Sequence, residues 1–162
     1  MKKGFAVWEL LVVITLVSVL TLGVVIMINP WEIRRKDRDI TRLQDLSNLR
    51  QAIDEAVKVA SASALCNGSI SCRDLSTTGT KAINGTGWVK VDISGQEDIV
   101  LLPVDPVNST DYHYTYCSNG TDWEINTVLE SDQQIKQMSK DGGNEDNKYE
   151  IGSSLDLICT QF

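Results

Sequence analysis

The chain has little of what catalysis by side chains requires. Its 162 residues include a single histidine, His113, and neither a G-x-S-x-G turn nor a glycine-rich phosphate loop. A catalytic triad needs a base beside its nucleophile, and the sequence gives His113 no such neighbour. We therefore expect a protein that is not an enzyme, with His113 as a half-buried residue of a strand.

Basic residues are scarce in the distal part of the chain. Residues 65–162 carry six Lys/Arg against fifteen Asp/Glu, a net charge of −9, whereas residues 1–64 carry nine against seven, a net charge of +2. Binding to nucleic-acid phosphates needs clusters of basic side chains. The charge distribution therefore argues against nucleic acid as a partner.

The four cysteines lack the spacing of a zinc site. No C-x-x-C pair occurs, and one histidine cannot complete a site of two cysteines and two histidines. Their even number favours disulfides, which are typical of an oxidising compartment and of a small domain with a limited core. The sequence leaves all three pairings open, but the short loop between Cys66 and Cys72 favours one bridge there and leaves Cys117 for Cys159.

What the chain does have is a long apolar run, from Phe5 to Ile28, with one charged residue, Glu9. As a helix this run spans roughly 36 Å, enough to cross a hydrocarbon core of about 30 Å. It is too long for a secretory signal peptide, and no small-x-small cleavage site follows it. A carboxylate in a membrane helix costs about 2.5 to 3.5 kcal/mol near the centre, so Glu9 is expected to have a cationic partner.

The first residues carry a family resemblance. Lys2-Lys3-Gly4-Phe5, with Glu9 at the head of an apolar helix, resembles the class III leader of type IV pilins and of type II secretion pseudopilins. The resemblance implies that residues 1–4 are a leader, that a prepilin peptidase cleaves between Gly4 and Phe5, and that Phe5 is then N-methylated. It also implies that Glu9 pairs with the amino-terminal charge of a neighbouring subunit and sets the stagger of assembly.

The resemblance further implies a single-pass membrane protein with a cytoplasmic N-terminus. Its C-terminal domain would be periplasmic or extracellular, and the filament would lie on the cell surface. Lys2 and Lys3 agree with this orientation, whereas Arg34, Arg35 and Lys36 on the exported side oppose it by the positive-inside rule. We favour the exported orientation because the leader and the cysteines both point to it.

Three regions follow the leader. Residues 5–29 form the membrane and assembly helix, and Pro30 is expected to kink it. Residues 30–64 form an amphipathic helix, and residues 65–162 form a soluble β-rich domain. The charges from Arg34 to Asp39 indicate a solvated helix face. Apolar residues recur every three or four positions along this helix and form a stripe on one face. We expect the stripe to pack on a sheet, with a coiled coil as the alternative. Its residues are Ile33, Ile40, Leu43, Leu46, Leu49, Ile53, Val57 and Ala60.

Within the distal part, alternation predicts strands over 88–93, 112–117 and 123–129, and Asn119-Gly120 predicts a hairpin between the last two. Residues 131–138 suit a short helix, and 149–151 and 155–159 suit short strands. Residues 65–87 are rich in Gly, Ser, Thr and Asn and are expected to be a loop.

A second resemblance lies in this half. Leu102-Pro103-Val104-Asp105-Pro106, Tyr112-x-Tyr114, the segment 120–125 and Asp141-Gly142-Gly143 are similar to the carboxyl-terminal half of major pseudopilins. Those proteins hold calcium in the distal loop, which makes Asp141, Asn144 and Asp146 candidate calcium ligands. The EF-hand pattern is absent, and a polar turn without a metal is the alternative.

These expectations describe an α+β pilin fold, with a long kinked N-terminal helix packed on a small antiparallel sheet. The expected function is a structural filament subunit. Its partners would be copies of itself, the prepilin peptidase, an inner-membrane assembly platform, and membrane lipid before assembly. A membrane-tethered minor pilin that binds DNA or surfaces is the first alternative, and a tethered enzyme is the second.

Overall fold

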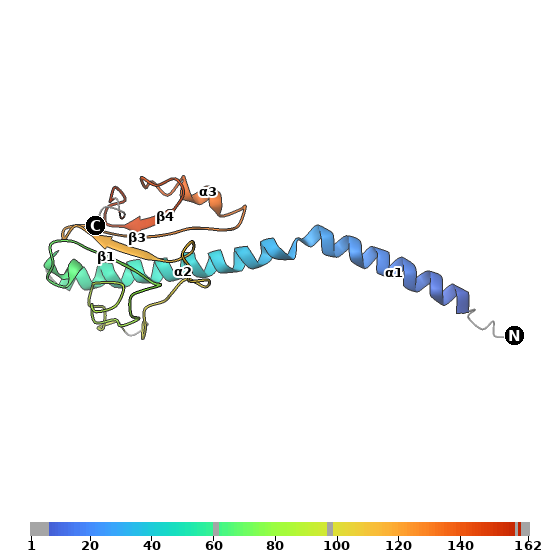
Figure 1. The fold of residues 1–162 in the computed structure, drawn as a ribbon, viewed down its shortest axis with the longest axis horizontal. Helices are drawn as coiled ribbons and strands as arrows, with labels where there is room; N and C mark the ends of the chain where they lie inside the picture. The colour runs from blue at the N-terminus through green and yellow to red at the C-terminus, as the bar shows by residue number, and fades with distance from the viewer. Residues whose placement is uncertain (1–6, 60–61, 97–98, 158, 160–162) are drawn as a thin grey trace. The chain divides into compact units, whose positions relative to one another are not determined.

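The computed structural model describes residues 7–59, 62–96, 99–157 and 159. Its contacts divide the chain into two compact units, Met1–Arg34 and Arg35–Phe162. The fold is α+β, with long N-terminal helices and a small antiparallel sheet consistent with a pilin-like fold (Figure 1). The elements are α1 (Val7–Ile28), α2 (Pro30–Val59), a 3-10 helix (Ala62–Cys66), β1 (Cys72–Leu75), β2 (Thr115–Ser118), β3 (Trp123–Thr127), α3 (Ile135–Met138) and β4 (Tyr149–Gly152).

The amphipathic helix is shorter than the sequence predicts. It ends at Val59, and residues 62–66 form a 3-10 helix rather than a continuation of the α-helix to residue 64. Asn67 and Gly68 follow with φ of 49° and 87°, the left-handed conformation that glycine and asparagine tolerate best. The predicted Asn-Gly stop is therefore present, and it directly follows the 3-10 helix.

The sheet has four antiparallel strands in the order β1-β2-β3-β4, so each strand pairs with the next one along the chain. The predicted hairpin is confirmed, because β2 and β3 pair with Ser118 opposite Trp123. Asn119 closes the turn, since its side-chain oxygen accepts the backbone N–H groups of Thr121 and Asp122. An Asx-type turn of this kind holds the backbone without help from distant residues.

Two strand predictions are wrong. Residues 88–93 form no strand, although their alternating residues Val89, Val91 and Ile93 are buried as expected. Residues 155–157 form none either. Conversely, β1 lies in the segment predicted as a loop, paired with β2 so that Cys72 lies opposite Ser118.

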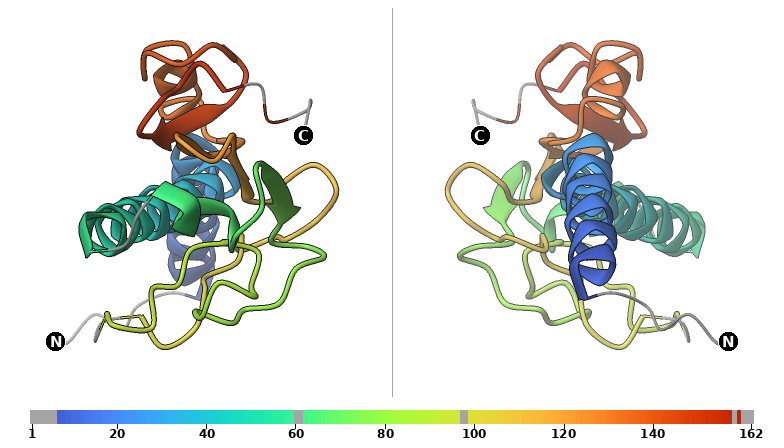
Figure 2. Two further views of the ribbon diagram at one scale, coloured as in Figure 1. Left: turned by 90° about the vertical axis from the view of Figure 1, so that its left-hand side faces the viewer. Right: turned by 90° about the vertical axis from the view of Figure 1, so that its right-hand side faces the viewer.

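The core lies between α2 and one face of the sheet. Leu46, Leu49 and Ile53 of α2 are fully buried, whereas Ile33 and Ile40 of the predicted stripe are 46% and 47% exposed. The packing on a sheet is therefore confirmed for the second half of α2 only. In Figure 1 most of the segment between β1 and β2 lies below α2, and in Figures 1 and 2 the segment from α3 onward lies above it. The sheet and the loops supply the remaining buried residues, which include Trp88, Tyr114, Tyr116, Trp123, Ile125 and Ile151.

Candidate functional site

Helix α1 is apolar and uncovered. Every side chain of residues 7–25 is exposed, and within the described part of the chain one helix is long and apolar enough to cross a membrane. Its polar side chains suit an apolar environment, because Thr15, Ser18 and Thr21 donate their hydroxyls to backbone carbonyls three or four residues earlier. Such internal pairing removes the cost of placing a hydroxyl in lipid or in a helix bundle.

The predicted processing residues Gly4 and Phe5 lie outside the described residues. Glu9 lies in the first turn of α1 and is exposed. The negative charge is favourably placed there, because a helix N-terminus carries partial positive charge. Its pairing with a neighbouring subunit stays a prediction.

The break between the helices lies at Asn29, directly before the predicted kink residue Pro30. Asn29 has φ of 46°, and Pro30 is the first residue of α2. The Asn29 carbonyl accepts the N–H groups of Glu32 at 3.0 Å and Ile33 at 3.4 Å, which starts the new helix. Proline suits a first helical position because it has no N–H to leave unsatisfied. The two residues act together, with asparagine supplying the left-handed backbone and proline restarting the helix.

A buried ionic network joins α2 to two distant loops. We call it the Arg42 network, and its members are Arg38, Asp39, Arg42, Asp105 and Glu130. The Arg42 side chain, fully buried, contacts Asp105 at 2.6 Å, Glu130 at 2.6 Å and Asp39 at 2.8 Å. Asp39 also accepts the backbone N–H groups of Glu130 and Ser131.

In the Arg42 network, hydrogen bonds oppose the effect of burial on the pKa values of Arg42 and Glu130. Burial by itself lowers the pKa of Arg42, but the hydrogen bonds that Arg42 donates to Asp105, Glu130 and Asp39 outweigh it and raise that pKa above its ordinary value. Burial likewise tends to raise the pKa of Glu130, and hydrogen bonds from Arg38 and Arg42 reverse this and lower it. The sequence interpretation of Arg34 to Asp39 as a solvated face is therefore wrong for Asp39, which is fully buried.

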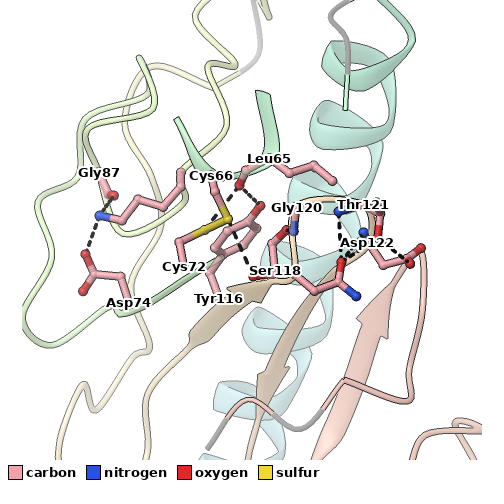
Figure 3. Close-up of a disulfide and its surroundings, with 12 residues drawn as sticks. Leu65, Cys66, Cys72, Asp74, Gly87, Tyr116, Ser118, Gly120, Thr121 and Asp122 are labelled. Atoms are coloured by element: carbon pink, nitrogen blue, oxygen red, sulfur yellow. Dashed lines mark hydrogen bonds and ion pairs between the residues drawn. A yellow bond between two sulfur atoms is a disulfide. The ribbon is translucent and has the colours of Figure 1, made fainter. Parts of the chain in front are cut away.

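Each disulfide joins a sheet strand to a segment outside the sheet. Cys66 pairs with Cys72 and Cys117 with Cys159, the pairing that the short first loop favoured. Figure 3 shows the first bridge beside Tyr116, whose hydroxyl donates to the Leu65 carbonyl at 2.6 Å. This bridge fixes the 3-10 helix next to edge strand β1, and the second fixes the C-terminal segment over β2.

The candidate calcium ligands Asp141, Asn144 and Asp146 lie in the loop between α3 and β4. Asp141 accepts the N–H of Gly143 at 3.0 Å and that of Glu150 at 2.8 Å, one on each carboxylate oxygen. Asn144 and Asp146 are exposed. Asp141 therefore holds the loop before β4 in place, and a calcium ion at these residues stays a prediction.

Among the described residues, one group of three potential ligand side chains is close enough to hold a metal: Cys117, Glu124 and Cys159. Both sulfur atoms belong to the second disulfide, so neither is a thiolate and the group does not fit a metal. Glu124 is instead part of a buried carboxyl pair with Glu150, on the sheet face away from α2. One oxygen of each carboxyl has no hydrogen-bond partner, and burial raises the pKa of Glu124 to about 8, with the charge of Glu150 adding to the effect.

His113 has a structural contact rather than a catalytic one. Its Nδ1 lies 3.1 Å from the Ser109 carbonyl, in a shallow hollow formed with Leu75, Thr77 and Thr78. A backbone carbonyl is not a nucleophile to be activated, so this contact supplies no part of a triad.

Comparison with protein-family models, with curated proteins and with solved structures finds no match. A function has to be inferred from the chain's own residues.

Proposed function

We propose that this chain is a structural subunit of a type IV pilus or a type II secretion pseudopilus, and that it polymerises through α1 after prepilin peptidase has removed residues 1–4. The observation that supports this most strongly is the uncovered apolar surface of α1, in a chain whose second unit, Arg35–Phe162 (the distal unit), has its own buried core. A surface of this size marks a membrane or protein contact.

The two environments that can cover α1 are lipid and other copies of the same helix. Many apolar side chains of α1 are more than half exposed, among them Leu10, Leu11, Ile14 and Val17. At about 25 cal/mol per Å² of apolar surface, leaving a whole helix of such residues in water is strongly unfavourable. A pilin subunit uses both covers in turn, because it waits in the membrane and then packs its helix into the filament core.

Glu9 gives this assembly a register. Once the leader is removed, the amino group of Phe5 carries a positive charge into the helix bundle. A carboxylate one turn along a neighbouring helix can accept it, and a buried pair of this kind specifies alignment more than it adds net stability. A subunit shifted by one helical turn would leave both charges unpaired.

The filament role also gives an account of the disulfides and the acidic distal part. Two bridges strengthen a small domain that faces an oxidising compartment, and a net negative charge keeps such a domain soluble before assembly. The proposed partners are copies of the chain itself, the prepilin peptidase and an inner-membrane assembly platform.

The test is the intact mass and amino-terminal sequence of the protein purified from its native membrane or filament fraction. We expect a chain that starts at N-methylated Phe5. A Glu9→Gln variant is expected to be processed and inserted normally but absent from filaments, with Glu55→Gln, an exchange of the same kind in α2, as the matched control. An intact leader, or a cut beyond Ile28, would contradict the proposal.

A further inference from the structure

The start of α2 carries an exposed aromatic and cationic pair. Trp31 is 71% exposed, and the guanidinium carbon of Arg34 lies 5.7 Å from the centre of its ring. The two residues are one helical turn apart and so share a face. A cation over a tryptophan ring gains roughly 0.5 to 1 kcal/mol at an exposed site, so the pair holds an arginine close to an amphipathic ring.

A second exposed tryptophan lies at the other end of α1. Trp8 is 69% exposed and lies at the start of α1, whose 22 residues correspond to about 33 Å of helix, and Trp31 follows three residues after α1 ends. Between them the side chains are apolar or small, apart from Glu9, Asn29 at the break between the helices, and three hydroxyl residues whose hydroxyls bond within the helix. A hydrocarbon core is about 30 Å thick, and tryptophan concentrates at both of its surfaces.

A short basic run follows Trp31 in α2. Arg34, Arg35 and Lys36 are consecutive and exposed, and lie on the side where the positive-inside rule disfavours them. Arg38, by contrast, is paired with Glu130 at 2.8 Å within the Arg42 network. Glu32 and Asp37 flank the basic run and limit its net charge, so a diffuse attraction to acidic surfaces is weak. A local contact between Arg34 and an individual phosphate is the better fit, because a guanidinium binds a phosphate in a two-pronged geometry.

We propose that Trp31 and Arg34 form a binding site for the headgroups of phospholipids and thereby fix the depth of α1 in the membrane before assembly. The ring lies at the level of the lipid glycerol groups, and the guanidinium binds a lipid phosphate while it stacks on the ring. This proposal depends on the part of the proposed function in which α1 spans a membrane, but not on processing or on filament formation.

The test uses the full chain inserted into vesicles of phosphatidylcholine and phosphatidylglycerol, with bromine placed either near the headgroup or near the end of the lipid chains. A Trp8→Phe exchange leaves Trp31 as the exposed member of the remaining tryptophans, because Trp88 and Trp123 are 0% and 1% exposed. We expect the shallow bromines to quench the exposed tryptophan at least about twofold more strongly than the deep bromines. In the same background, Arg34→Gln is expected to bring the two quenching efficiencies towards equality.

The matched control is Arg50→Gln, which changes another exposed arginine of α2 and is expected to leave the quenching ratio unchanged. Flotation of the same vesicles reports insertion separately. Failure to float with the vesicles would contradict the membrane role of α1 itself. If the protein floats with the vesicles, three results would overturn the headgroup site alone. These are no quenching of Trp31, stronger quenching of Trp31 by the deep bromines, and a ratio of shallow to deep quenching that Arg34→Gln does not change.

Discussion

Removal of the Arg42 side chain is expected to be among the most damaging single changes in the distal unit. Arg42 is fully buried and pairs with three carboxylates, from Asp39, Asp105 and Glu130. Arg42→Ala leaves these carboxylates in place without their shared cation. Breaking a buried ion pair by removal of one partner costs about 3 to 5 kcal/mol, because the remaining charge is desolvated and uncompensated.

The matched control lies on the same helix. Arg50 pairs with Asp54 at 3.8 Å, with both side chains about half exposed. An exposed pair four residues apart on a helix contributes about 0.3 to 0.5 kcal/mol, so Arg50→Ala is expected to change stability by less than about 1 kcal/mol. Both substitutions place alanine in the same helix, which cancels the effect of helix propensity.

The assay is urea unfolding of the full chain in detergent micelles, followed by the fluorescence of the buried Trp88 and Trp123. We expect the midpoint for Arg42→Ala to fall well below that for Arg50→Ala, with part of the loss recovered in an Arg42→Ala, Asp105→Asn double variant. The recovery is expected because the second exchange removes one of the uncompensated charges. A loss below about 1 kcal/mol for Arg42→Ala, or no recovery in the double variant, would refute the view that a buried network joins α2 to the loops.

The remaining predictions concern the covalent links and the buried carboxyl pair. The bridge between Cys117 and Cys159 spans 42 residues, and its loss is expected to lower the free energy of unfolding by about 4 kcal/mol. The bridge between Cys66 and Cys72 spans 6 residues, and its loss is expected to lower that free energy by about 2 kcal/mol. Paired Cys→Ala variants compared by urea unfolding measure both losses. An equal cost would contradict this account by chain entropy. Because the pKa of Glu124 is raised from 4.5 to about 8, the native state holds a proton that the unfolded state releases, so stability is expected to fall as pH rises through this interval. Glu124→Gln should flatten that dependence, and an unchanged pH profile would show that the carboxyl is ionised in the native state.

The helices and the hairpin could be predicted because local sequence determines them. An apolar run of 24 residues, from Phe5 to Ile28, has few alternatives to a helix, and Asn119-Gly120 between two alternating segments leaves little choice of turn. The pairing of Cys66 with Cys72 was favoured for the same reason, since the two are six residues apart.

The features that could not be predicted depend on distant partners. Strand β1 has the sequence Cys-Arg-Asp-Leu, with no alternation, and is a strand because β2 and a disulfide hold it at the sheet edge. Residues 88–93 alternate like a strand but are fixed individually. Trp88 donates to the Pro103 carbonyl and Lys90 pairs with Asp74. Alternation identified the buried Val89, Val91 and Ile93, but Trp88 is buried as well, and alternation does not show whether a neighbouring strand is present.

The Arg42 network shows the same limit at a larger separation. Arg42 lies 63 residues from Asp105 in sequence, and no spacing rule connects them. A buried arginine is also unexpected on composition alone, because charged residues are rarely buried unless they are paired. A weak indication was present, since Asp39 and Arg42 are three residues apart and lie on the same helical face as the buried Leu46 and Leu49.

The distal unit buries apolar side chains in a core, whereas the apolar side chains of residues 7–25 in α1 are exposed, so variants of the two units are expected to fail in different ways. The distal unit has its own covered core, held by the Arg42 network and two disulfides, whereas α1 has no covered side chain among residues 7–25. A change in α1 such as Glu9→Gln alters an exposed side chain. A change such as Arg42→Ala removes buried contacts among residues of the distal unit. If α1 serves assembly and the distal unit folds by itself, the first variant should lose filaments at full stability, and the second should lose stability while its α1 still inserts into membranes.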